Sequence, residues 1–266
     1  MNSNAVSPRR PASAAAVVAI AIAAGLILAG CGGSSSSSGA AGGNAANSSP
    51  KASHSPSSGG SKPAVTSASV PFPIGVGDTW KYKTTYGTTV NKMTAVTPVS
   101  GGQQVTMSSA ITSLGTTTHD TAYYVVHSDG SISLPFSQFN TNSSTASIKL
   151  ISGNIFWPPA DQLSSGQAYH DTLKIEFSED GMQQDVTAHV TVQGAGTQSV
   201  TVPAGTYNAD VVNMTMSETI EGIAVSSVVR TWLAPGVGPV KSEVILHEGS
   251  TDHIAALNEL VSFKAG

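Results

Sequence analysis

The chain has 266 residues, of which 39% are hydrophobic and 11% charged, and its formal net charge is −4 with neutral histidines. All 16 acidic residues follow residue 70, whereas four of the 12 Lys and Arg residues precede it, so the remainder has a net charge of −8. This acidic balance argues against nucleic acid as a partner, and against electrostatic docking on anionic lipid.

The first 30 residues have the three parts of a secretory signal. Arg9 and Arg10 form a short basic region, and an uncharged apolar run covers residues 14–30. Ala29 and Gly30 supply the small residues that a cleaving peptidase requires. The segment is therefore predicted to direct export. An uncleaved transmembrane helix is the alternative, because 17 residues reach the lower limit for a membrane span.

The series Leu28-Ala29-Gly30-Cys31 resembles the lipobox of bacterial lipoproteins. The resemblance implies cleavage between Gly30 and Cys31, and attachment of acyl chains such as palmitate at Cys31. Two acyl chains make a stable anchor. The chain is thus expected to be exported and lipid-anchored to the bacterial cell membrane, with its domain on the extracytoplasmic side.

Residues 31–70 are rich in Ser, Gly, Ala and Pro, and they contain no acidic or aromatic residue. Such a segment cannot bury enough apolar surface to offset its ordering entropy, which predicts a disordered tether. A flexible coil of this length has a mean span of roughly 35 Å. We interpret it as a passive spacer.

Residues 71–266 form the predicted globular domain. Cys31 is the only cysteine of the chain, so the domain has no internal disulfide. Apolar and polar residues alternate at 103–111, 172–178, 186–192 and 240–246, a pattern typical of half-buried strands. The segment 136–163 is poorly periodic, and it is expected to be a long connection with a short strand at 147–151 and a short helix at 160–163.

Turn signals separate the predicted strands. Asp129-Gly130 and Asp180-Gly181 predict hairpins, and three further segments predict breaks: Gly101-Gly102, Gly194-Ala195-Gly196 and Pro235 to Pro239. About ten antiparallel strands predict an all-β domain curled into a barrel, a half-barrel or a sandwich. The segment 77–80 is echoed at 166–169, which leaves open an origin from two similar halves.

Three segments resemble a pattern of uncharacterised β-rich bacterial envelope lipoproteins: Gly75 to Tyr82, Val200 to Tyr207 and Thr231 to Lys241. That pattern consists of strands and turns and implies no catalytic residue. More distantly, an anchored, curved antiparallel sheet is similar to the unclosed barrels of lipid-carrier lipoproteins, which is an analogy of fold alone.

The sequence contains no nucleophile elbow, Walker loop or zinc-protease motif, so neither enzymatic activity nor a cofactor is predicted. His247, Asp252 and His253 are the best metal candidates, because a hairpin at Gly249-Ser250 would bring both imidazoles together. The alternative is a solvated polar turn, and no metal site is predicted.

These observations favour a non-catalytic envelope lipoprotein that binds an apolar or amphipathic ligand, or a protein partner, on a curved β-scaffold. The runner-up is a structural or interaction lipoprotein with a filled core, and an enzyme of unknown class comes third. An apolar interior of several hundred Å³ would favour ligand binding over a filled scaffold.

Overall fold

The computed structural model describes residues 73–134, 141–142, 146–179, 182–220, 223–248 and 251–266. Cys31, Gly30 and the tether lie outside the described residues, so the anchor stays a prediction. None of the helices in the described ranges is long and apolar enough to cross a bilayer.

The elements are β1 (Thr79–Thr84), β2 (Gly87–Val99), β3 (Gly102–Ser113), β4 (Thr116–His127), β5 (Ile132–Leu134), β6 (Thr141–Asn142), β7 (Ala146–Ser152), β8 (Ile155–Trp157), α2 (Ala160–Ser164), β9 (Ala168–Glu179), β10 (Met182–Val202), β11 (Gly205–Ile220), β12 (Ile223–Ala234), β13 (Gly238–Glu248) and β14 (Thr251–Lys264).

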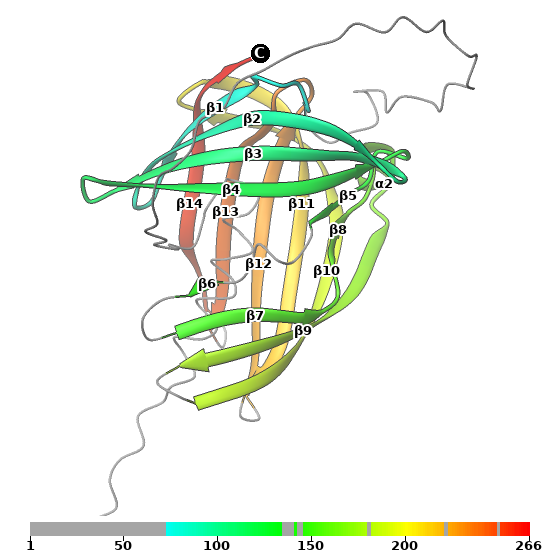
Figure 1. Ribbon diagram of the computed structural model, residues 1–266, viewed down its shortest axis with the longest axis vertical. Coiled ribbons are helices and arrows are strands. Elements are labelled where there is room, and N and C mark those ends of the chain that lie inside the picture. Colours follow the sequence, from blue (N-terminus) through cyan, green and yellow to red (C-terminus); the bar gives the residue numbers. More distant parts are fainter. Residues whose placement is uncertain (1–72, 135–140, 143–145, 180–181, 221–222, 249–250) are drawn as a thin grey trace, which may run out of the picture.

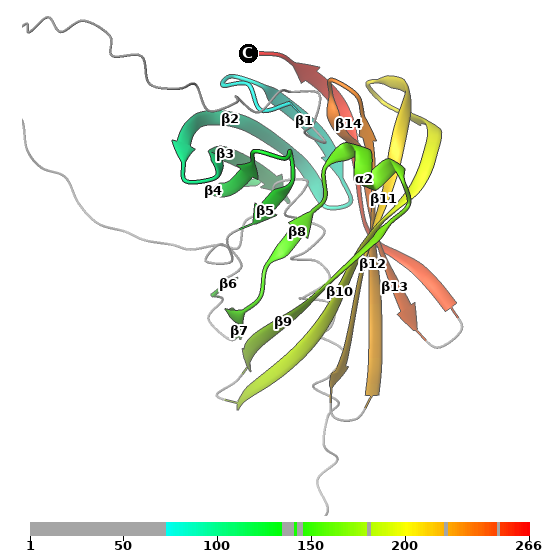
Figure 2. The ribbon, with the colours of Figure 1, turned by 90° about the vertical axis from the view of Figure 1, so that its right-hand side faces the viewer.

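All the strands form one antiparallel sheet with the order β6-β7-β9-β10-β11-β12-β13-β14-β1-β2-β3-β4-β5-β8. The first and last long strands meet in its middle, where Thr79 of β1 pairs with Lys264 of β14. In Figure 1, β2, β3 and β4 run across β11 to β14, and Figure 2 shows the sheet curled around an interior that is open on one side. The predicted all-β class is confirmed, and its form is a half-barrel.

The predicted strands lie within β3, β9, β10 and β13, and the expected strand at 147–151 and helix at 160–163 are β7 and α2. Asp129-Gly130 makes the predicted turn between β4 and β5, with the Gly130 amide donating to the carbonyl of His127. β9 and β10 pair up to Glu179 and Met182, on either side of Asp180-Gly181, which lie outside the described residues. The segments echoed at 77–80 and 166–169 lead into β1 and β9 respectively.

The predicted break at Gly194-Ala195-Gly196 is wrong, because β10 runs unbroken through it as one long strand. The pairing with β11 only shifts here, from Gly194↔Val212 to Thr197↔Asp210, which is a β-bulge. Gly194 instead serves packing. A Cβ at this position would lie 1.7 Å from the carbonyl oxygen of Leu163, so only glycine lets α2 approach β10 this closely.

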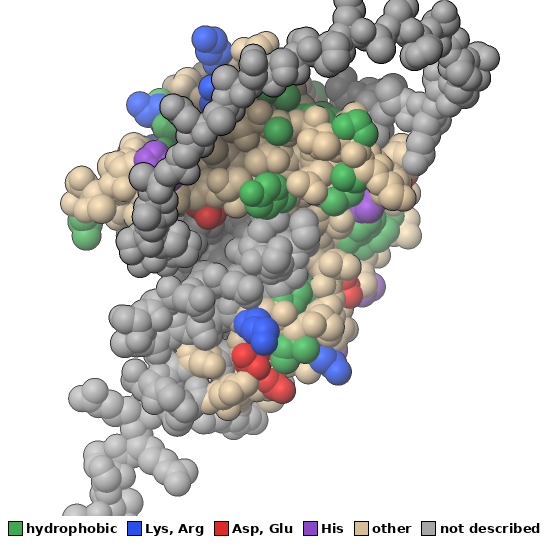
Figure 3. All heavy atoms as spheres, viewed as in Figure 1, with side chains coloured by type: hydrophobic (Ala, Val, Ile, Leu, Met, Phe, Trp, Pro, Cys, Tyr) green, Lys and Arg blue, Asp and Glu red, His purple; other side chains and the backbone are tan. Residues whose placement is uncertain are grey.

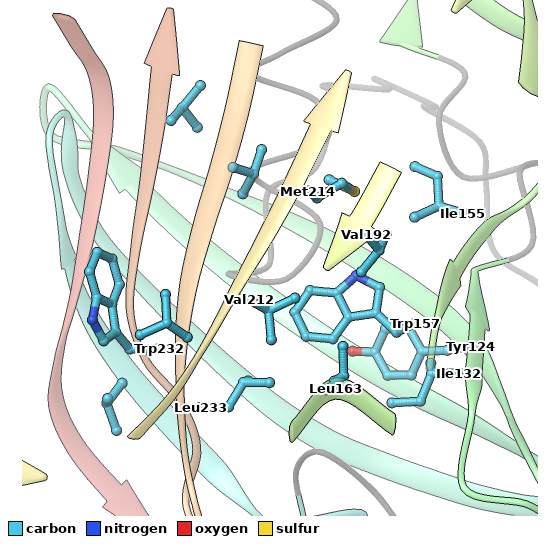
Figure 4. Close-up of a cluster of buried hydrophobic side chains, with 14 of the residues drawn as sticks. Tyr124, Ile132, Ile155, Trp157, Leu163, Val192, Val212, Met214, Trp232 and Leu233 are labelled. Atoms are coloured by element: carbon cyan, nitrogen blue, oxygen red, sulfur yellow. The ribbon is translucent and has the colours of Figure 1, made fainter. Parts of the chain in front are cut away.

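One hydrophobic cluster joins both halves of the sheet. Trp80 and Trp232 are buried in it, and the Trp80 indole donates to the carbonyl of Val237. Near α2 the interior is filled, because Leu163 and Trp157 lie among side chains from β4, β10 and β11 (Figure 4). This part of the half-barrel is a packed core.

A bend at Gly153 carries the chain from one end of the sheet to the other. β7 pairs with β9, whereas β8, which begins three residues after β7 ends, pairs with β5. Gly153 has φ +103°, and a Cβ there would lie 2.5 Å from the carbonyl oxygen of Thr172. The bend therefore requires glycine, and it brings the two ends of the sheet together.

Candidate functional site

The two ends of the sheet meet where β8 passes β9, a junction that we call the seam. In the described part of the chain, no backbone ladder joins these two strands. Side chains link them instead. The ring centroids of Phe156 and Tyr169 are 6.0 Å apart, and the backbone N–H of Asn154 donates to the side-chain Oδ2 of Asp171 at 3.3 Å. The half-barrel is thus held together at the seam by side-chain contacts.

A cavity of about 490 Å³ lies at this junction, and we call it the seam cavity. Its volume falls within the range of small-molecule sites. Five strands and the bend before β8 contribute to its wall, with these described lining residues: His127, Ser133, Asn154, Phe156, Tyr169, His170, Asp171, Val190 and Val192.

One wall of the seam cavity is apolar. Val190 and Val192 are buried on the inner face of β10, and the register places them opposite Asp171 and Tyr169 of β9. Directly opposed residues of an antiparallel pair point to the same face, so all four side chains face the interior. The Phe156 ring lies against Tyr169 and extends this apolar surface.

The other wall is polar. The Nε2 atom of His127 lies 2.9 Å from the Ser133 hydroxyl, which ties the end of β4 to β5. Asp171 accepts hydrogen bonds from the amides of Asn154 and Thr172. Apolar and polar groups therefore share one cavity, which is the lining that an amphipathic molecule requires.

A second cavity, about 820 Å³ in volume, lies over β10 to β13. The register aligns His189, Ser217, Ser226 and His247 in one row across these strands. The two histidines lie at the ends of this row, and each imidazole already has a hydrogen-bond partner. His189 Nδ1 lies 3.4 Å from the hydroxyl of Thr172, and His247 Nδ1 lies 2.6 Å from Asp252 Oδ1. This cavity is lined mainly by hydroxyl and imidazole groups.

The three metal candidates are not brought together. The β13–β14 hairpin forms, and its register sets Asp252 opposite His247 but His253 opposite Leu246. Because successive residues of a strand point to opposite faces, His253 faces away from the other two. No group of three His, Cys, Asp or Glu residues that could hold a metal ion occurs among the described residues.

Glu218 is a buried acid with a clearly raised pKa. It pairs with Ala188 and Val225 and is only 8% exposed. Its Oε2 atom has no hydrogen-bond partner in the described structure. Burial in this environment raises the pKa of Glu218 to about 7.

The sequence reasoning identified His247 and Asp252 but missed the seam. Asp171 and Asn154 are unremarkable in sequence, and they meet because the pairing of β7 with β9 ends beside them, at Ser152↔Lys174. The available signal was Gly153 itself, an isolated glycine directly after a predicted strand, which often marks a bend or a close backbone approach.

Comparison with known proteins agrees with this fold. The structure of a candidate lipoprotein from Parabacteroides distasonis is similar, with 17% sequence identity and a TM-score of 0.53. The match covers 74% of this chain and 99% of the Parabacteroides chain. A candidate exported protein with a YmcC-like fold from Bacteroides fragilis is also 17% identical, with a TM-score of 0.51 and the same two coverages. No curated protein matches the chain. The DUF3108-like family model matches residues 79–251, and the chain therefore belongs to the DUF3108-like family.

Proposed function

We propose that this protein is a membrane-anchored envelope lipoprotein whose half-barrel binds an amphipathic ligand without catalysing a reaction. Acylated Cys31 is the anchor, residues 32–70 are the tether, and the seam cavity is the binding site. The function is retention or transfer of a small molecule at the extracytoplasmic surface of the membrane.

The seam cavity is the observation that carries this proposal. Its volume of about 490 Å³ suits a small molecule, and its two walls differ in polarity. The lining offers an apolar surface at Val190 and Val192 beside the carboxylate of Asp171.

The anchor rests on the lipobox and on relatives of the same fold. One structural neighbour is described as a candidate lipoprotein and another as a candidate exported protein. Replacement of Cys31 by Ser removes the thiol that is acylated. The variant is expected to lose its acyl mass and to keep an uncut signal segment. An unchanged mass for the mature protein would contradict the lipobox assignment.

Native mass spectrometry of the full chain, purified from membranes of its own host, tests ligand binding. We expect an adduct of defined mass, which solvent extraction then identifies. Val192→Phe fills the seam cavity and should remove the adduct. Ser199→Phe is the matched control, because Ser199 is exposed on the same strand and does not line the cavity, and it should retain the adduct. An adduct that survives Val192→Phe would place the ligand elsewhere.

The second candidate is an interaction scaffold, and the packed interior near α2 favours it. Trp157 and Leu163 fill the space that a barrel-type carrier would leave for its ligand (Figure 4). On this hypothesis the full chain carries no adduct, and crosslinking in cells captures an envelope protein instead.

A further inference from the structure

The polar wall of the seam cavity contains one fixed charge. Asp171 is an acid, and no Lys or Arg is among the described residues of the lining. We propose that the ligand is an amphiphile with a protonated amine as its polar group, which Asp171 receives. This inference rests on the proposed function of the seam cavity and adds the chemical class of the ligand.

Asp171 is held in place and still has bonding capacity. The Thr172 amide donates to Oδ1 at 2.7 Å, and the Asn154 amide donates to Oδ2 at 3.3 Å. A carboxylate offers about four lone-pair sites, so each oxygen can accept one further hydrogen bond. An ammonium group carries three donors and matches this capacity with a charge-assisted bond.

A ligand with a carboxylate or phosphate group fits this wall poorly. Its charge would lie beside Asp171, and like charges in a partly desolvated site repel; the described lining holds the imidazoles of His127 and His170 but no Lys or Arg with a permanent positive charge. The domain as a whole has twice as many acids as bases. On the face drawn in Figure 3, Lys and Arg side chains lie in small separate groups. The field around the cavity therefore favours cations.

The apolar part of the amphiphile packs beside the Asp171 carboxylate, on the neighbouring strand β10. Val190 and Val192 stand in the same cross-strand rows as Asp171 and Tyr169. Neighbouring strands lie about 4.8 Å apart. The alkyl chain of an amine bound to Asp171 therefore reaches the side chains of Val190 and Val192 directly. The adjacent strands β9 and β10 thus bind the amine and the alkyl chain, respectively.

The test compares two probes that share an alkyl chain, dodecylamine and dodecanoate. The acylated full chain is released from non-ionic detergent at neutral pH. Native mass spectrometry then measures the fraction of the protein that carries each probe. We expect dodecylamine to bind at least about tenfold more tightly than dodecanoate. Asp171→Asn should weaken dodecylamine binding about fivefold, the scale of a partly exposed charge pair. Asp120→Asn on β4 is the matched control and should leave both affinities unchanged.

Ionic strength gives a second measurement that needs no variant. Between about 0.01 and about 1 M salt the Debye length falls from about 30 to about 3 Å, so dodecylamine affinity should fall across this range. Equal binding of the two probes, or an unchanged dodecylamine affinity in a folded Asp171→Asn variant, would overturn the inference and leave the ligand site intact. Absence of binding by either probe would count against the seam cavity as the site, and so against the proposed function as well.

Discussion

The ring of Phe156 lies against the ring of Tyr169, with centroids 6.0 Å apart and planes inclined by 48°. The two residues belong to β8 and β9, so this contact joins opposite regions of the sheet. A side-chain contact has none of the repeated backbone hydrogen bonds that hold neighbouring strands together. Among the described strands, this contact thus joins β8 to β9 without a backbone ladder, and the candidate ligand cavity lies beside it.

Gly153→Ala should strain the bend between β7 and β8. The residue has φ +103°, and the new Cβ would lie 2.5 Å from the Thr172 carbonyl oxygen. Gly101→Ala is the matched control, since Gly101 has φ +84° with nothing within 4 Å of a built Cβ. The left-handed backbone alone costs about 1–2 kcal/mol, and the overlap at Gly153 should add about 1–3 kcal/mol. Urea unfolding of both variants measures the difference, and equal losses would show that the bend tolerates a side chain.

Much of the fold could be predicted because strands and hairpins have local signals. The alternation at 172–178 and 186–192 and the Asp129-Gly130 turn all correspond to structure. Gly194 shows the limit of this reasoning. A glycine-rich segment looks like a turn in sequence, but its conformation is decided by the β11 ladder and by α2, both distant along the chain. Tertiary contacts overrode the local preference.

The candidate site was beyond sequence reasoning for a related physical reason. Asn154 and Asp171 are 17 residues apart, and each is an ordinary polar residue in its own segment. They meet because β7 pairs with β9 up to Ser152↔Lys174, a register between segments more than 20 residues apart, before the chain turns to pair with β5 as β8. The histidine row has the same origin, since His189 and His247 align only through the register of four strands.

Tyr82→Phe should destabilise the junction between β1 and the start of β13. The Tyr82 hydroxyl donates to the carbonyl of Pro239 at 2.9 Å, and burial raises the pKa of this phenol, so it stays a neutral donor. Loss of a buried hydrogen bond costs about 1–3 kcal/mol when the acceptor is left unpaired. Tyr86→Phe is the control, because Tyr86 is 61% exposed and its 3.4 Å bond to Ala255 is long. Thermal unfolding should show a clear loss for the first variant and little change for the second.

Leu163→Ala should open a hole in the packed core beneath α2. Leu163 is 3% exposed and lies beside Trp157 and Val212 in Figure 4. Truncation of a buried leucine costs about 2–5 kcal/mol, depending on how far the surroundings collapse. Leu114→Ala removes the same atoms from a fully exposed side chain, and chemical unfolding should find it close to wild type. Similar values for the two variants would mean that the interior near α2 is loosely packed.

Glu218 should make the protein less stable as the pH rises from about 4.5 to about 7. The ordinary pKa of the carboxyl is 4.5, and burial raises it to about 7 in the folded protein. Within this window the unfolded chain releases the proton while the folded chain keeps it, so the unfolded state binds fewer protons and the free energy of unfolding falls. Below pH 4.5 both states are protonated, and above pH 7 both are ionised, so this contribution to the slope vanishes.

Glu218→Gln removes this titration and keeps the size of the side chain. Urea unfolding at several pH values should show a flatter stability profile between pH 4.5 and 7 than wild type, with the largest gain in stability at pH 7 and above. Ser217→Ala, a neighbour on the opposite face of β11 that carries no titrating group, should keep the wild-type slope. A Glu218→Gln profile that is parallel to wild type would show that the carboxyl is hydrated in the folded protein.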